Sequence, residues 1–175
     1  MRHLEIPTLR GTFTKVNGDV QHFAADPSKF AFDVTIDAPS WDTPVEMRDS
    51  NRRSAHFLDT AKYPTITFKS KRVEGAGADK LKVIRNLTIN RVTKQVWLDG
   101  DGPTPPTKDP RGNAQVGASA TTQIKRQDSG VSSLPGMIGD DVTNVIDVEL
   151  VEPSGKPPPR RLSKRSYLIR CFVER

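Results

Sequence analysis

Residues 30–37 have the sequence FAFDVTID, and they decide the fold class. Apolar side chains stand at every second position, at Phe30, Phe32, Val34 and Ile36, with Asp or Thr at most positions between them. Successive side chains of a strand point to opposite faces of a sheet. Strict alternation therefore predicts a strand with one buried face and one face in water.

The same alternation recurs along the chain in residues 65–72, 81–89, 96–98, 116–124 and 142–150. Turn-forming residues separate these segments, at Asn17-Gly18, Asp26-Pro27, 75–79, 100–113 and 136–140. Many short strands with frequent turns are typical of a sandwich or a barrel. Residues 44–59 lack alternation and predict a loop with a short helix. We expect an all-β antiparallel fold with one short helical crossing.

Composition favours a thin-walled fold of one domain. The chain has 175 residues, of which 34% are hydrophobic and 6% aromatic, too few for a thick core. A barrel suits this shortage, because one sheet encloses its own interior. No apolar run approaches the roughly 18 residues that span a bilayer. No apolar segment of a secretory signal follows Met1, so the chain as written is expected in the cytoplasm.

The positive charge belongs to the C-terminal segment. Residues 153–175 hold seven of the 27 basic side chains and one of the 21 acidic ones, which leaves 20 of each sign in residues 1–152. This distribution argues against nucleic acid as a partner. We expect a domain over residues 1–152 and a disordered, Pro-rich basic tail over 153–175. Two other roles for the tail stay open, contact with anionic lipid and pairing of residues 167–173 with an open sheet edge.

Signals for catalysis and metal binding are weak. The three histidines, His3, His22 and His56, lie far apart and form no pattern of metal ligands. The single cysteine, Cys171, lies in the tail, and no nucleophile or phosphate-binding motif is present. We expect no catalytic residue, no metal and no cofactor, and hence no enzyme. An enzyme acting on an apolar substrate is the weakest alternative, since it needs an acid or base inside the barrel.

Several segments, in this order and spacing, resemble the YceI-like family: Arg10 to Lys15, Arg48 to Asp59, Lys62 to Ser70, Leu87 to Ile89 with Val92 to Lys94, Asp109 to Asn113, Ala118 to Ile124, Gly139 to Val142 and Ile146 to Glu149. The resemblance covers residues 2–152. It implies an extended, lipocalin-like antiparallel barrel crossed by a helix, which holds a polyisoprenoid or similar lipid. It also implies a bacterial protein, periplasmic if the true start lies upstream. The family has no established catalytic residues.

The sequence departs from the family pattern in several places. The family's usual first strand, ahead of residues 2–4, is absent from the chain as written, which would leave an open edge on the barrel. Arg85 and Arg91 stand where the family usually has glycine. Ser129 stands where an aromatic residue is usual, and the tail has no counterpart.

A ligand inside the barrel would contact the inward-facing apolar residues. We expect the lining to comprise Phe13, Phe32, Val34, Ile36, Phe57, Ile66, Phe68, Leu87, Ile89, Val96, Ala118, Ala120 and Ile146. Small Ala118 and Ala120 and the scarcity of aromatic residues favour a cavity over a filled core. Arg48, Asp49 and Arg53 are candidates for holding a polar head group. A salt-bridged connecting segment is the simpler interpretation of that charged cluster.

The leading functional hypothesis is binding, and carriage or sequestration, of a long-chain amphiphile. The alternative is a protein-interaction module with a filled barrel, which recruits partners through its open edge or its basic tail. A lipid or isoprenoid is the expected ligand, and the oligomeric state is left open between monomer and homodimer.

Overall fold

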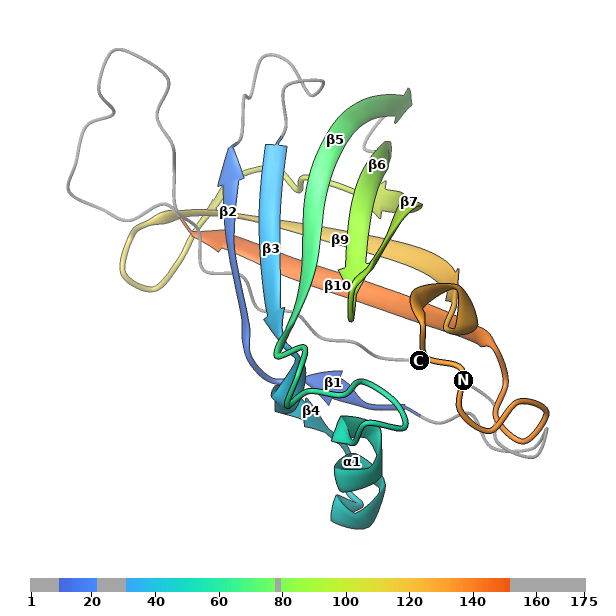
Figure 1. The fold of residues 1–175 in the computed structure, drawn as a ribbon. Helices are drawn as coiled ribbons and strands as arrows, with labels where there is room; N and C mark the ends of the chain where they lie inside the picture. Colours follow the sequence, from blue (N-terminus) through green and yellow to red (C-terminus); the bar gives the residue numbers. More distant parts are fainter. Residues whose placement is uncertain (1–9, 22–30, 78–79, 152–175) are drawn as a thin grey trace.

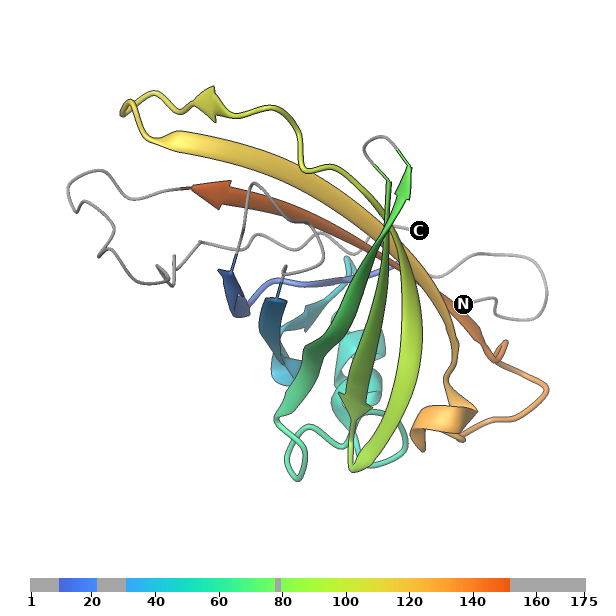
Figure 2. The same cartoon turned by 90° about the horizontal axis from the view of Figure 1, so that it is seen from above.

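The computed structural model describes residues 10–21, 31–77 and 80–151. One antiparallel sheet dominates it and curls around an interior (Figures 1 and 2). Its strands are β2 (Val16–Gln21), β3 (Ala31–Asp37), β5 (Thr65–Gly77), β6 (Lys80–Ile89), β7 (Val92–Asp101), β8 (Thr107–Lys108), β9 (Ala114–Lys125) and β10 (Asp141–Val151). The expected all-β antiparallel fold is confirmed.

The strand order is β10-β9-β7-β6-β5-β3-β2, and β8 also pairs with β9. Within the described residues, β2 and β10 form the two edges and do not pair with each other. The part of the barrel formed by residues 10–21, 31–77 and 80–151 is therefore open along one seam. One strand in from the β10 edge, β7 joins β9 through only three residue pairs, from Asp99 with Thr121 to Asp101 with Ser119.

The predicted strands form because their alternation matches the two faces of the sheet. Along β6, inward positions are buried and the positions between them are half-buried: Val83, Arg85, Leu87 and Ile89 alternate with Ile84, Asn86 and Thr88. The turn expected at Asn17-Gly18 is wrong. Both residues lie within β2 and pair with Thr35 and Val34 of β3, so sheet pairing overrides the local preference for a turn.

A small unit closes one end of the curled sheet (Figure 1). It comprises β1 (Thr12–Phe13), which pairs with β4 (Trp41–Asp42), the 3-10 turn η2 (Ala38–Ser40), and helix α1 (Glu46–Arg53). The helix expected within residues 44–59 is thus confirmed. The 3-10 turn η3 (Gln127–Ser129) and the loop that follows it bring Val131 and Ile138 into the same apolar core.

Some sequence-based predictions lie outside the described residues. These are the structure at Phe30, the tail over residues 153–175 with its edge-strand alternative, and the positions of His3, His22 and Cys171. The division of the chain at residue 152 stays a prediction.

Candidate ligand-binding interior

Two adjacent cavities occupy the interior of the curled sheet. The helix-side cavity, about 120 Å³, is lined by Phe13, Ile36, Trp41, Arg52, Phe57, Leu58, Ile66, Phe68, Leu87, Ile89, Ile124, Arg126, Ser129, Val131, Val142, Asn144 and Ile146. The far cavity, about 100 Å³, is lined by Phe32, Val34, Ile36, Phe68, Leu81, Val83, Arg85, Leu98, Gly100, Asp101, Ala118, Ser119, Ala120, Ile146 and Val148. Ile36, Phe68 and Ile146 belong to both, so the two cavities share a wall.

The structure places all but one of the predicted lining residues around these cavities. Val96 is the exception, since it is buried in the core cluster and lines neither of them. Ala118 and Ala120 line the far cavity, as their small size suggested. That these residues contact a ligand stays a prediction.

The charged cluster proposed for a head group connects β4 to α1. The Asp49 carboxylate, 1% exposed, accepts hydrogen bonds from the Thr43 backbone N–H at 2.8 Å and from the Thr43 hydroxyl at 2.7 Å. Arg53 donates to the Trp41 carbonyl at 3.0 Å and to Glu46 at 2.5 Å. Neither they nor Arg48 line either cavity. Their contacts match the simpler interpretation of a salt-bridged segment, and a head-group role stays a prediction without support from the cavity lining.

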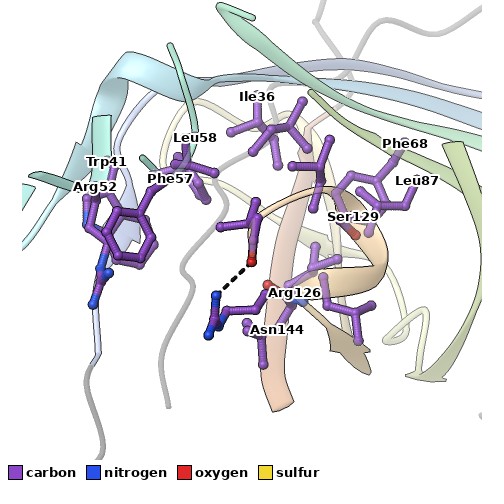
Figure 3. Close-up of a pocket in the computed structure, with 17 residues that line it drawn as sticks. Ile36, Trp41, Arg52, Phe57, Leu58, Phe68, Leu87, Arg126, Ser129 and Asn144 are labelled. Carbon is purple, nitrogen blue, oxygen red and sulfur yellow. Dashed lines mark hydrogen bonds between the residues drawn. The ribbon is translucent and has the colours of Figure 1, made fainter. Parts of the chain in front are cut away.

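Arg52 is the arginine of α1 that reaches the helix-side cavity (Figure 3). Its guanidinium lies 4.2 Å from the centre of the Phe57 ring, and its Nε is buried with no hydrogen-bond partner. Burial, and then the charges of Arg126 and Arg48, lower the pKa of Arg52. Sequence reasoning placed Arg52 in the charged cluster of residues 48–59 but did not select it for the head group. Its signal was the three-residue spacing from Asp49, which puts both on one face of the helix.

Arg126 also lines the helix-side cavity, but its hydrogen-bonding capacity is used within the protein (Figure 3). Its Nε donates to the Gly139 carbonyl at 3.0 Å, and one Nη donates to Val131 at 2.7 Å and Ser133 at 2.8 Å. The other Nη donates to Ile138 at 3.0 Å. Arg126 therefore holds residues 131–139 against the end of the sheet.

Arg85 is the buried charge of the far cavity. The residue is 3% exposed, and its guanidinium carbon lies 2.9 Å from the centre of the Phe32 ring and 5.9 Å from that of Phe68. Its Nε is buried without a partner, and its side chain forms no hydrogen bond or ion pair with any residue in the described ranges. Burial alone lowers the pKa of Arg85 well below its ordinary value.

The contacts of Arg85 do not offset the cost of its burial. A desolvated cation over an aromatic ring gains about 2 kcal/mol. The effective penalty for taking an ion out of water is several kcal/mol, even after the protein relaxes. Sequence reasoning missed Arg85, although the alternation of β6 contained the signal. Position 85 shares the inward parity of Leu81, Val83, Leu87 and Ile89.

Comparison with known proteins agrees with this architecture. Residues 1–150 match the profile of the YceI-like domain. Protein YceI of Salmonella newport (strain SL254) is 36% identical over 156 residues, covering 87% of this chain and 78% of that protein. A UPF0312 protein of Azotobacter vinelandii is 35% identical over 151 residues, covering 84% and 76%. The chain belongs to the YceI-like family.

Solved structures extend the family likeness to the fold. The crystal structure of the Campylobacter jejuni YceI protein superposes with a TM-score of 0.78 at 30% identity, covering 88% of this chain and 91% of that one. BcnA of Burkholderia cenocepacia gives a TM-score of 0.69 at 22% identity over 82% and 87%, a likeness of fold alone. In the part of the chain that the structure describes, no helix is long and apolar enough to cross a membrane.

Proposed function

We propose that this YceI-like protein binds a long-chain amphiphile of polyisoprenoid type in its interior, and carries or sequesters it. The observation that carries the proposal is the pair of adjoining cavities, whose walls are mostly apolar side chains. Burying a hydrocarbon chain there would stabilise the complex by about 0.8 kcal/mol for each CH₂ group, before ordering costs. The walls also favour binding over an interaction module with a filled barrel, because that alternative needs a solid interior.

Native mass spectrometry of the full chain, purified without detergent, tests the proposal. The expected result is one bound species whose extracted form has a long hydrocarbon chain. An empty, folded protein whose melting temperature does not rise on addition of polyprenol would contradict the proposal.

A matched pair of variants on β9 connects binding to the interior. Ala120 lines the far cavity, whereas its neighbour Thr121 is exposed on the outer face of the sheet. Ala120→Leu fills part of the cavity, so we expect the fraction of lipid-bound protein to fall by half or more. Thr121→Leu adds similar bulk outside and should leave that fraction unchanged. Equal effects of the two variants would place the lipid elsewhere.

A further inference from the structure

The far cavity contains a buried cation, Arg85, for which the described residues supply no acidic partner. Asp101 lines the same cavity, but it forms an ion pair with Lys80 and its side chain is 64% exposed. We propose that Arg85 binds the anionic head group, a carboxylate or a phosphate monoester, of an amphiphile whose chain runs from the far cavity into the helix-side cavity. This inference rests on the proposed function and specifies the charge and direction of the ligand.

The stacking of Arg85 determines which atoms can meet a ligand. The guanidinium carbon lies over the Phe32 ring, 2.9 Å from its centre. The N–H groups point outward in the plane of the guanidinium, so its edge remains for hydrogen bonding. This planar fork fits the two oxygens of a carboxylate or two oxygens of a phosphate. Phe32 thus orients the guanidinium, and a bound anion would accept hydrogen bonds from its N–H groups.

The backbone around Arg85 is also irregular. The pairing of β5 with β6 has a bulge at this point, where the register shifts by one residue. Ser70 pairs with Arg85, but Arg72, two residues further along β5, pairs with Ile84. Bulges of this kind re-aim side chains and are enriched beside functional sites. The lining of the far cavity also includes three small residues, Gly100, Ala118 and Ala120, which leave room for a head group.

The charges of the other two buried arginines of the described residues, Arg126 and Arg52, are stabilised by contacts within the protein. Arg126 donates to four backbone carbonyls. Arg52 stands in the last turn of α1, where a cation is stabilised by the partial negative charge of the helix C-terminus. Arg85 is in the middle of a strand, where sheet dipoles are small. Of these three arginines, Arg85 is therefore the one whose charge a bound anion would stabilise most.

The shared wall gives the direction of the chain. Ile36, Phe68 and Ile146 line both cavities, so the two cavities adjoin. In the proposal, a hydrocarbon chain attached to a head group at Arg85 runs past these three side chains toward α1. The helix-side cavity has a largely apolar lining that suits the remaining length. The head group would thus lie within the barrel, in the cavity farther from the charged residues Arg48, Asp49 and Arg53.

Calorimetric titration of the lipid-free full chain with hexadecanoic acid, hexadecyl phosphate and hexadecanol tests the inference at pH 8. The three probes share one chain and differ in the head group. We expect at least one anionic probe to bind about tenfold or more tightly than the alcohol, because hydrogen bonds to charged groups are the stronger ones. Preference for the acid or for the phosphate identifies which anion the site takes.

Variants assign this preference to a residue. Arg85→Met should bring the anionic probes to the affinity of the alcohol, and Arg85→Gln, which keeps N–H donors without the charge, should retain part of the preference. Arg91→Met, which removes an exposed arginine just beyond the end of β6, should change nothing. Equal affinity for all probes in the wild-type protein overturns the inference and leaves the proposed function standing. So does a preference that survives Arg85→Met and disappears in Arg52→Met. Failure of all three probes to bind contradicts the proposed function, and the inference with it.

Discussion

Arg126 and Arg85 are both 3% exposed, yet they differ in the hydrogen bonding of their side chains. Arg126 donates four hydrogen bonds to backbone carbonyls between Val131 and Gly139. The guanidinium of Arg85 lies over the Phe32 ring, and the Arg85 side chain has no hydrogen-bonding partner among the described residues. The comparison teaches that burial of a charge does not by itself indicate its role. A buried arginine that is saturated by its own chain supports the fold, whereas an unsaturated one in a cavity is available to a ligand.

The largest effect should come from removing the saturated arginine. Arg126→Met leaves four carbonyl acceptors without their donor, and each buried group left unsatisfied costs about 1–3 kcal/mol. Since some of these carbonyls will reach water, we expect the free energy of unfolding to fall by about 4 kcal/mol. Urea denaturation followed by circular dichroism measures this loss.

Lys125→Met provides the matched control for Arg126→Met. The neighbouring lysine is 60% exposed and pairs only loosely, at 3.5 Å with Asp141 and 3.9 Å with Asp140. Surface pairs of this kind contribute about 0–1 kcal/mol, so the control should change little. A similar loss in both variants would show that the four carbonyl contacts of Arg126 are not what stabilises residues 131–139.

Removing the unsaturated arginine should have the opposite sign. Arg85→Met replaces a desolvated charge by an apolar side chain of similar length, a change that is often neutral or stabilising. After subtracting the lost contact with Phe32, we expect the lipid-free protein to gain about 1 kcal/mol, a rise in melting temperature of about 3 °C for a chain of this size. Scanning calorimetry measures it. A loss of more than about 2 kcal/mol would mean that Arg85 supports the fold as Arg126 does.

The fold was predictable because alternation is a local property of the sequence. It placed Val34, Ile36 and Phe68 on the inner face, and the same rule applied to residue 85 would have put an arginine inside. A pattern of apolar residues alone does not reveal a charge on the inner face, because Arg85 interrupts the apolar series at an inward position. The spacing of Asp49 and Arg52 likewise contained the signal for the inward face of α1.

Other features depend on tertiary contacts that no local pattern encodes. The loop after η3 places Val131 and Ile138 in the core, and it is held by donors of Arg126 from the end of β9. The strand through Asn17-Gly18 forms because β3 supplies hydrogen-bonding partners along its length. In both places, pairing between segments decides the structure.

The smallest effect should come from a charge that is saturated but lies at the surface. Asp109, in the turn between β8 and β9, accepts hydrogen bonds from the Asn113 side chain at 2.7 Å, the Asn113 backbone at 2.7 Å and the Arg111 backbone at 2.8 Å. The side-chain bond from Asn113 is the main cause that lowers the pKa of Asp109 below its ordinary 3.8. Asn113→Ala should therefore raise this pKa, as read from a carboxyl NMR titration. Arg111→Gln, which removes the weakest contribution, should raise it less.

The sign of the pH effect follows from the direction of that shift. A carboxyl whose pKa is lowered by folding stabilises the folded state above its unfolded value of 3.8, and this contribution is lost as pH falls through the lower folded value. Wild-type protein and Asn113→Ala should thus differ less in stability at pH 2 than at pH 6. Because Asp109 is in contact with water, the difference should be far smaller than that of Arg126→Met, although both groups are saturated. A loss of stability comparable to that of Arg126→Met would show that a fully hydrogen-bonded charge stabilises the fold equally well at the surface. Burial would then be irrelevant to the comparison of Arg126 with Arg85.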